Sequence, residues 1–285
     1  MTAIKTMLIT SAPLLAAEAE AAGVSRIMVD MEYIGKKERQ KNLTAHAGVH
    51  QKGDVAKVRA SLKKAELVVR VNPWHEGSKA EIDYAVEGGA DIIMLPMIEE
   101  MGQFARFIDT LGKRAKPLPL VETRYSMEHI GDIAANPAVD ELYIGFNDLH
   151  LSLGLDFLFE PLALGLVDIM ASTIKSRGKK FGFGGIAAIG GGDLPARNIL
   201  GEHARLGSTC VILSSQFGRD IRINEPSGRE QRLAGAVNIL QEAYRELIKR
   251  PLAQQQLEAR QTFAIIETLA EKARNQRKPQ THATS

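Results

Sequence analysis

The chain has 285 residues, of which 45% are hydrophobic and 25% charged, an ordinary globular composition that can bury a sizeable core. Its 36 Lys and Arg side chains nearly balance its 34 Asp and Glu side chains, so no overall field favours nucleic acid or a membrane surface as a partner. The single cysteine, Cys210, excludes an intramolecular disulfide, and no run approaches the ~18 apolar residues that span a bilayer, so we expect a cytoplasmic protein.

Short apolar runs alternate with amphipathic segments up to about residue 247, which predicts parallel strands joined by helices. Several of the runs are apolar at successive positions, as is typical of a sheet covered on both faces. In chain order, the expected strands are 7–10, 26–32, 67–72, 91–97, 118–123, 141–146, 180–185 and 209–214, and the expected helices are 14–22, 54–64, 79–88, 100–111, 127–135, 160–176 and 196–206. Eight such units predict an α/β fold, a (β/α)8 TIM barrel with additional C-terminal helices.

An open, doubly wound sheet is the alternative architecture. That fold usually has fewer strands and a glycine-rich turn after the first strand. Here Ser11, Ala12 and Pro13 follow the first strand. The barrel is therefore the preferred prediction.

The pattern also predicts how the chain is divided. The barrel is expected to be a catalytic domain over residues 1–225. Two long helical patterns, 229–247 and 251–275, predict a helical extension over 226–276 that packs on the barrel or on a partner subunit. A polar tail, 277–285, is expected to be disordered. The long polar loop 33–53 is interpreted as a lid or a loop that sets substrate specificity.

Charged side chains gather at the ends of the predicted strands, where TIM-barrel enzymes carry their active sites. These residues are Asp30, Glu32, Arg70, Glu122 and Asp148. Such charges are costly unless they are paired or bind a metal, so ion pairs across the rim are the alternative to a site. Glu122 and Asp148 are one βα repeat apart, and two carboxylates suit Mg2+, Mn2+ or Co2+ while leaving positions open for substrate. The planar donors of Arg70 match a substrate carboxylate or an enolate oxygen.

Five stretches, 27–32, 68–72, 91–97, 120–123 and 144–154, resemble motifs of the HpcH/HpaI aldolase and citrate lyase beta-subunit family, which are metal-dependent barrels of the pyruvate and phosphoenolpyruvate superfamily. The stretches come in the family order, and the resemblance covers about residues 7–217. It implies that Glu122 and Asp148 bind the metal and that Arg70 contacts a 2-oxo acid. It also implies that backbone amides around Asn147 and Asp148 hold the substrate carboxylate.

The implied function is a divalent-metal-dependent carbon-carbon lyase or aldolase, or a synthase in the condensing direction. The substrate would be pyruvate or a related small 2-oxo acid, reacting through a metal-bound enolate. The family likeness and the long C-terminal helices predict a homo-oligomer, a hexamer or a trimer. Asp30 and Glu32 are expected to take part in catalysis.

Two alternatives come from particular residues. The aldolase branch has a His directly after the acidic motif of the second strand, and Tyr33 stands there in this chain. Tyr is a poor base at neutral pH, although it is able to donate a proton. A barrel that has lost catalysis and binds a ligand therefore stays open. The pattern of Asp30 and Glu32 also resembles the acyl-CoA lyase branch, so a lyase or hydrolase of the citryl- or malyl-CoA type is a further alternative.

A glycine-rich loop, 181–192, follows the seventh strand, where barrels often bind phosphate. Gly184 and Gly185 are therefore candidate substrate-binding residues for an anionic portion of the substrate. Turn glycines without a ligand are the alternative.

The remaining candidates carry weaker signals. His46 and His50 have the spacing of two metal ligands on a helix, but they lack a third ligand, so a role in substrate contact or proton transfer is preferred. His129 and His203 are expected at the surface of exterior helices. His150 is expected to pack beside the rim, and Cys210 to be a core residue and not a nucleophile. Trp74 is expected to line the pocket mouth or to pack within its loop.

Overall fold

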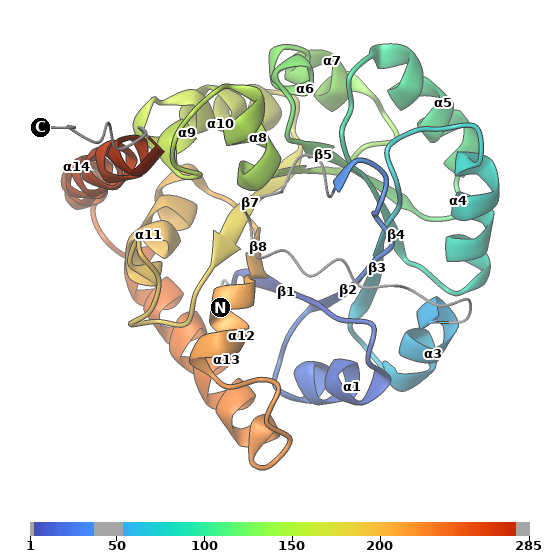
Figure 1. Cartoon of the computed structure of the whole chain (residues 1–285), viewed down its shortest axis with the longest axis horizontal. Helices are drawn as coiled ribbons and strands as arrows, with labels where there is room; N and C mark the ends of the chain where they lie inside the picture. Colours follow the sequence, from blue (N-terminus) through green and yellow to red (C-terminus); the bar gives the residue numbers. More distant parts are fainter. Residues whose placement is uncertain (1–2, 37–53, 278–285) are drawn as a thin grey trace, which may run out of the picture.

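The computed structural model describes residues 3–36 and 54–277, and at its centre lies a closed barrel of eight parallel strands (Figure 1). Neighbours along the chain are neighbours around the barrel, and the last strand pairs with the first. The strands are β1 (Lys5–Ile9), β2 (Arg26–Asp30), β3 (Glu66–Arg70), β4 (Ile92–Leu95), β5 (Lys116–Val121), β6 (Glu141–Ile144), β7 (Lys180–Ile186) and β8 (Cys210–Leu213). The predicted TIM barrel is confirmed.

Helices form a ring around the barrel (Figure 1). Those described are α1 (Pro13–Ala21), α3 (Asp54–Ser61), α4 (Ser78–Glu87), α5 (Met101–Leu111), α6 (Arg124–Glu128), α7 (Ile130–Ala135), α8 (Phe146–Ser152), α9 (Glu160–Ala163), α10 (Leu166–Ser176), α11 (Ala196–Leu206), α12 (Ser215–Asp220), α13 (Arg229–Leu247) and α14 (Leu252–Arg277). The single predicted helix 160–176 is two helices, because Gly165 adopts a φ of 70° between them. The short helices α8 and α12 were not predicted.

Apolar side chains fill two layers. One set points into the barrel and comprises Met7, Met28, Val68, Ile92, Met94, Leu118, Leu120, Tyr143 and Cys210. A larger set lies between the strands and the helical ring. Because strand residues alternate between these two layers, both faces of the sheet are apolar, and this explains the uninterrupted apolar runs in the sequence. Cys210 is fully buried, and burial raises the pKa of its thiol to about 12, in agreement with the expected core role.

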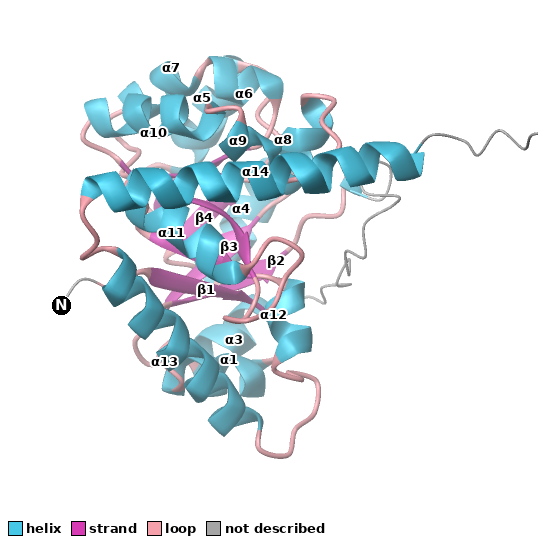
Figure 2. Ribbon diagram, turned by 90° about the vertical axis from the view of Figure 1, so that its left-hand side faces the viewer, coloured by secondary structure: helices cyan, strands magenta, loops and turns pink. Residues whose placement is uncertain are grey.

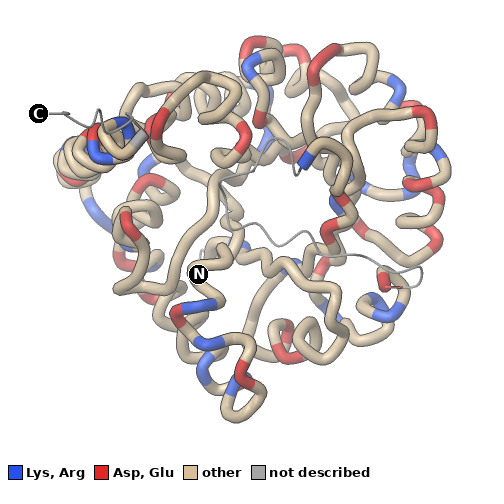
Figure 3. The backbone as a smooth tube through the Cα atoms, in the orientation of Figure 1, with Lys and Arg blue, Asp and Glu red and all other residues tan. Residues whose placement is uncertain are grey.

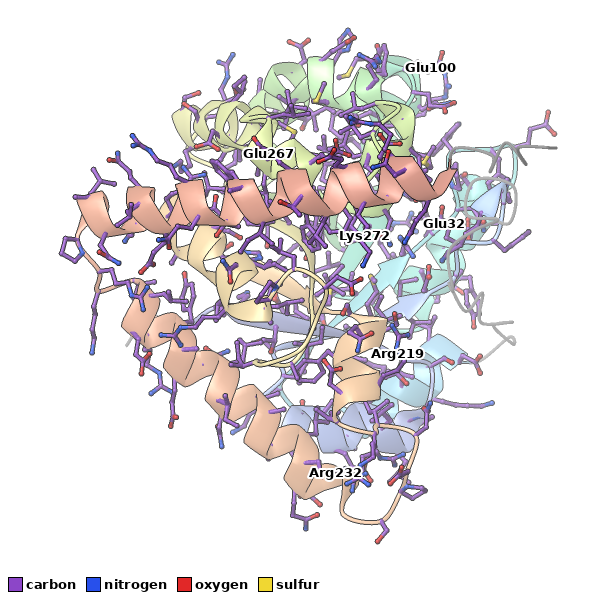
Figure 4. The ribbon with its side chains drawn as sticks, turned by 60° about the vertical axis from the view of Figure 1, so that its left-hand side comes forward. Glu32, Glu100, Arg219, Arg232, Glu267 and Lys272 are labelled. Carbon is purple, nitrogen blue, oxygen red and sulfur yellow. The ribbon has the colours of Figure 1, made fainter. Side chains whose placement is uncertain are left out.

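The two C-terminal helices differ in what they contact. Helix α13 packs on α1 and α11, and α14 crosses the outside of the barrel against α9 and α11 (Figure 2). The guanidinium of Arg205 lies 5.8 Å from the ring centroid of Phe263, and Asn198 donates to Thr262 Oγ1 at 3.0 Å. Near the end of α14, Arg274 Nε donates to Asp156 at 2.7 Å. The contacts of α14 therefore run along its length, on which Figure 4 labels Glu267 and Lys272.

Charges of both signs are interspersed over the helical ring (Figure 3). Within residues 3–36 and 54–277, no helix is long and apolar enough to cross a membrane. Most of the predicted lid loop, including His46 and His50, and the tail from residue 278 lie outside the described residues.

Tyr143 connects three strands inside the barrel. Its hydroxyl donates to the Gly184 carbonyl at 2.7 Å and accepts from the Ile212 N–H at 2.8 Å, at the point where the pairing of β7 with β8 shifts register. A Cβ on Gly182 would lie 2.5 Å from the Tyr143 ring. Glycine at position 182 therefore makes room for the tyrosine ring. The tyrosine hydroxyl in turn bonds backbone groups of β7 and β8 where the register shift interrupts their regular hydrogen bonding.

We expect Tyr143→Phe to lower the free energy of unfolding by about 1–3 kcal/mol, because it leaves the partly buried N–H of Ile212 and the buried carbonyl of Gly184 without this partner. Urea unfolding measures the loss. Tyr244→Phe is the matched control, since the Tyr244 hydroxyl makes one long bond, 3.3 Å, to the Ser208 carbonyl. Equal losses in the two variants would contradict this role for Tyr143.

Candidate active site

Four carboxylates and one arginine lie at or just after the carboxyl ends of β2, β3, β5 and β6. Asp30 and Arg70 are the last residues of β2 and β3 and are register partners in the barrel. Glu122 directly follows β5, and Asp148 lies in α8, which follows β6. In Figure 4 the labelled Glu32 lies at this end of the barrel. The barrel thus brings together the charged residues that the sequence placed at its rim.

Asp30 is held between two cations. Arg70 donates to it through Nε at 2.9 Å and through Nη2 at 2.7 Å, and Lys36 Nζ donates to Oδ2 at 2.6 Å. Burial by itself would raise the pKa of Asp30, but the charges and hydrogen bonds of Arg70 and Lys36 outweigh it and hold the pKa well below its usual range. Asp30 is therefore an ionised acceptor that fixes the orientation of Arg70.

Glu32 extends this cluster. Its Oε2 lies 3.4 Å from Arg70 Nη1 and 3.8 Å from Lys36 Nζ. Burial acts to lower the pKa of Arg70, but the charges of Asp30, Glu32 and Glu122 outweigh burial and hold the pKa above its ordinary value. Arg70 is thus a permanent cation surrounded by carboxylates.

Asn72 holds the chain that leaves β2. Its Oδ1 accepts from the N–H groups of Tyr33 and Ile34, both at 2.9 Å, and its Nδ2 donates to Glu81 at 2.7 Å. Asn72 is 2% exposed, so this clamp lies inside the molecule. It fixes the turn between Glu32 and Lys36. Neither Asn72 nor Lys36 was assigned a role from the sequence, because their contacts depend on how this turn folds.

Glu122 is buried at the centre of the rim, with 2% of its surface exposed. Its Oε1 accepts from the Met97 N–H at 3.1 Å, and Met97 adopts a φ of 51°, which is uncommon for a residue other than glycine. A Cβ on Gly145 would lie 2.9 Å from Glu122 Oε2. Burial first, and then the negative charges of Glu32 and Asp148, raise the pKa of Glu122 well above its ordinary value, while Arg70 opposes the shift.

Asp148 is also buried, with 4% of its surface exposed, and lies in the first turn of α8. Its neighbour Asn147 is exposed. His150, on the same helix, is buried and bonds through Nδ1 to the Phe146 carbonyl at 2.9 Å, as expected for a residue that packs beside the rim.

The donor set fits a divalent cation. Among the described residues no group of three or more His, Cys, Asp or Glu side chains is arranged to hold a metal. Two hard carboxylates, Glu122 and Asp148, are a set that Mg2+ typically uses together with water and substrate. Besides burial, the negative charges of Glu32 and Asp148 act on Glu122 and raise its pKa. A divalent cation at this place would remove that repulsion.

The other predicted site residues are placed differently. The Tyr33 side chain is 67% exposed, so its role as a proton donor stays a prediction. Gly184 is buried, and a Cβ there would lie 3.1 Å from the Phe146 ring; a Cβ on Gly185 would lie 3.2 Å from Ser214 Cβ. Close packing therefore explains both glycines, and their contact with substrate also stays a prediction.

The glycine-rich loop 181–192 lies against the carboxylate of Asp220. Asp220 Oδ2 accepts from the Ala188 N–H at 3.1 Å, and a side chain on Gly191 would collide with the same carboxylate. A phosphate group at this loop would be repelled by Asp220. The phosphate interpretation gains no support from the structure.

His203 corrects an expectation from the sequence. The residue was expected at the surface, but it is fully buried, and its ring stacks on Phe183 with 3.7 Å between the centroids. Its Nδ1 lies 2.8 Å from Ser208 Oγ. Helix α11 turns this position inward, so burial lowers the pKa of His203 to about 3.

This shift predicts a dependence of stability on pH. The unfolded chain protonates His203 near its ordinary pKa of 6.5, whereas the folded chain does so only near 3. Between these values the unfolded state binds more protons, so stability falls as pH is lowered, by at most about 1.4 kcal/mol per pH unit from this group. We expect His203→Phe to lose less stability than the parent between pH 6.5 and 4, as measured by urea unfolding. Parallel curves for the two proteins would contradict this.

The fold and the rim define a (β/α)8-barrel protein with a cluster of charged side chains at the carboxyl ends of its strands. A family model described as HpcH/HpaI aldolase/citrate lyase matches residues 6–157, more than half of the chain. The chain therefore belongs to the HpcH/HpaI aldolase/citrate lyase family, as its motifs had indicated. No curated protein sequence gives a significant match.

Solved structures share the fold at low identity. An HpcH/HpaI aldolase from Desulfitobacterium hafniense DCB-2 is 14% identical, with a TM-score of 0.58 over 78% of this chain and 90% of that one. An HpcH/HpaI aldolase/citrate lyase family protein from Burkholderia cenocepacia J2315 is 19% identical, with a TM-score of 0.57 over 81% and 95%. The citrate synthase SbnG is 16% identical, with a TM-score of 0.57 over 82% and 95%.

Proposed function

We propose that the protein is a divalent-metal-dependent carbon-carbon lyase, or a synthase in the condensing direction, that acts on pyruvate or a related small 2-oxo acid through its enolate. One observation carries this proposal. The carboxylates of Glu122 and Asp148 are buried at the same rim as a permanently charged Arg70, and burial together with the charges of Glu32 and Asp148 raises the pKa of Glu122. Membership of an aldolase and citrate lyase family supports it.

Glu122 and Asp148 would hold Mg2+ or Mn2+, which supplies Lewis-acid polarisation of the 2-oxo group when bound. Asn147 and Asp148 lie in the first turn of α8. The resemblance to the family implies that backbone N–H groups around these two residues hold the substrate carboxylate.

Arg70 would stabilise the negative charge that develops on the enolate oxygen. Asp30 accepts from Nε and Nη2, so the guanidinium plane is fixed before substrate arrives. A donor that is already oriented costs no reorganisation during the reaction, and such a group is commonly worth about 100- to 1000-fold in rate. Tyr33 stands where the aldolase branch has a His, and its side chain is 67% exposed, so its role in proton transfer stays a prediction.

Two reactions test the proposal, because both pass through the pyruvate enolate without needing an acceptor. They are exchange of the pyruvate methyl protons with D2O, followed by proton NMR with added Mg2+, and decarboxylation of oxaloacetate. We expect the protein to catalyse both, with loss of activity when EDTA removes the metal. Arg70→Lys should lose at least about 100-fold in both reactions, because a lysine lacks the fork geometry.

Arg59→Lys is the matched control, since Arg59 also pairs with an aspartate, Asp91 at 2.8 Å, but lies on the exterior helix α3. A protein that catalyses neither reaction with any of Mg2+, Mn2+ or Co2+ would overturn the proposal. In that case, turnover of malyl- or citryl-CoA would support the acyl-CoA alternative, and ligand binding without turnover the non-catalytic one.

A further inference from the structure

Lys36 is a buried ammonium group at the rim that the proposed function does not yet use. Its side chain is 7% exposed, and Nζ lies 2.6 Å from Asp30 Oδ2 and 3.8 Å from Glu32 Oε2. Lysine is rarely buried to this extent unless it is paired or functional. The Asn72 clamp on Tyr33 and Ile34 fixes the turn that carries it inward. Lys36 thus lies within the cluster of Asp30, Glu32 and Arg70.

The turn after β2 exposes the residue that the sequence made a candidate for proton transfer and buries Lys36, to which the sequence assigned no role. Tyr33 follows the acidic motif directly, yet its side chain is mostly exposed. Lys36, three positions later, reaches back to Asp30. Of these two residues of the described turn, Lys36 and not Tyr33 is therefore the one that reaches the cluster.

Other members of the cluster are less suited to deliver a proton. Arg70 does not release its proton in proteins, and its carboxylate neighbours raise its pKa further, against the effect of burial. Asp30 is kept ionised by Arg70 and Lys36 and is an acceptor only. A lysine ammonium carries three donors, of which the bond to Asp30 uses one.

We propose that Lys36 transfers the proton at the acceptor oxygen in the carbon-carbon bond-forming and bond-breaking step, an inference that rests on the proposed function. In condensation, C3 of the enolate attacks the carbonyl carbon of an aldehyde, and the carbonyl π electrons move to its oxygen. Lys36 gives its proton to that oxygen, so a hydroxyl forms and the amine is left neutral. In cleavage the neutral amine takes the hydroxyl proton back as the carbon-carbon bond breaks. Solvent restores the protonation state of Lys36 between turnovers.

Two reactions that share the enolate differ in whether they need a proton at the acceptor oxygen. Decarboxylation of oxaloacetate breaks a carbon-carbon bond without any hydroxyl proton to move. Condensation of pyruvate with an aldehyde needs that proton. We expect Lys36→Gln to lower condensation at least about 100-fold, the usual contribution of general acid-base catalysis. Decarboxylation should fall by a much smaller factor, so the ratio of the two rates is the quantity to compare.

Lys36→Arg distinguishes proton transfer from positioning. A guanidinium keeps the positive charge and is able to pair with Asp30 and Glu32, but it does not give up a proton. We expect Lys36→Arg to lose condensation as Lys36→Gln does, while its Mn2+ affinity, followed by electron paramagnetic resonance, and its thermal unfolding match the parent. Lys79→Gln is the control, because Lys79 forms a similar pair with Asp83, 2.7 Å, but is 77% exposed on α4.

The assay uses pyruvate with acetaldehyde, glycolaldehyde and glyoxylate, with NMR detection of the 4-hydroxy-2-oxo acid products. Restored condensation in Lys36→Arg would overturn the inference and leave Lys36 a positioning residue. Equal loss of decarboxylation and condensation in both variants would also overturn it, because that is the effect of a damaged site. Parent protein that decarboxylates oxaloacetate but condenses no acceptor overturns the inference alone. Parent protein that does neither overturns the proposed function, and the inference with it.

Discussion

Glu122→Gln and Asp148→Asn should each lower Mn2+ affinity at least about 100-fold, because loss of a group that only supports a metal ligand already costs about 10- to 100-fold. Both variants should also lose enolate formation from pyruvate and oxaloacetate. Each substitution keeps the shape of the side chain, and the Gln oxygen is still able to accept from the Met97 N–H. The loss would therefore come from the charge and not from a disturbed rim.

The stability of the metal-free protein should change in the opposite direction. Burial and the charges of Glu32 and Asp148 raise the pKa of Glu122 above its ordinary 4.5, so the folded state binds more protons than the unfolded state above pH 4.5. The contribution of Glu122 to stability consequently falls as pH rises from 4.5 through the raised pKa. We expect metal-free Glu122→Gln to be more stable than the parent at neutral pH, and saturating Mn2+ to reverse the order.

Calorimetric titration with Mn2+ and thermal unfolding with and without the metal measure these two effects. Glu202→Gln is the matched control, since Glu202 is also 2% exposed and burial raises its pKa, but it lies on α11 and pairs with Arg205. Unchanged Mn2+ affinity in both rim variants would rule out the assignment of the metal ligands.

Arg26→Met should lower the free energy of unfolding by about 3–5 kcal/mol, because it removes one partner of a buried ion pair and leaves the other uncompensated. Arg26 is 3% exposed at the amino-terminal end of the barrel, opposite to the candidate site. It donates to Glu141 at 2.9 and 2.7 Å and to Glu66 at 3.0 Å. Glu66 has two further partners, Lys5 at 3.0 Å and Lys116 at 2.9 Å.

This network explains the charges at that end of the barrel. Burial would raise the pKa of Glu66, but bonds from Lys116, Lys5 and Arg26 lower it to about 2. Glu141 depends more strongly on Arg26, which bonds both of its oxygens. Glu141→Leu combined with Arg26→Met should therefore recover much of the loss, since replacement of a whole buried pair by apolar side chains is often nearly neutral.

Urea unfolding of the two single variants and the double variant gives the coupling energy. Arg197→Met serves as the control, because its pair with Glu246 at 2.7 Å is exposed to solvent, which screens the two charges, so its loss should change stability little. Enolate formation should be preserved in folded Arg26→Met, because the pair lies at the opposite end of the barrel. A loss no larger than that of Arg197→Met would contradict the prediction.

The barrel was predictable because its strands are buried on both faces and read as uninterrupted apolar runs. The rim was predictable because a charge at the end of such a run has few uses other than pairing or binding. The short helices could not be predicted from the sequence. Helix α8 follows directly on β6, and no amphipathic repeat is long enough within Phe146–Ser152 to signal it. The break at Gly165 was also missed, since a glycine inside a helical pattern often stays in the helix.

Buried polar residues were predicted less well, because burial at one position depends on the neighbouring elements. His203 has the helical spacing of an exterior residue, yet α11 turns it against Phe183. Asn72 follows a strand, as several other residues do, but only the fold shows that it hydrogen-bonds to the turn after β2.

The sequence by itself determined the barrel, the family and the four carboxylates with Arg70 at the carboxyl ends of the strands. The alternation of apolar runs with amphipathic segments is sufficient for the barrel and its rim, because all strand ends of a parallel barrel meet at one rim, and the five motif stretches are sufficient for the family. Only the tertiary structure decided which side chains reach the cluster after the strands end. Beyond β2 the direction of each side chain is set by the Asn72 hydrogen bonds to the turn, and these leave Tyr33 exposed and bring Lys36 to Asp30.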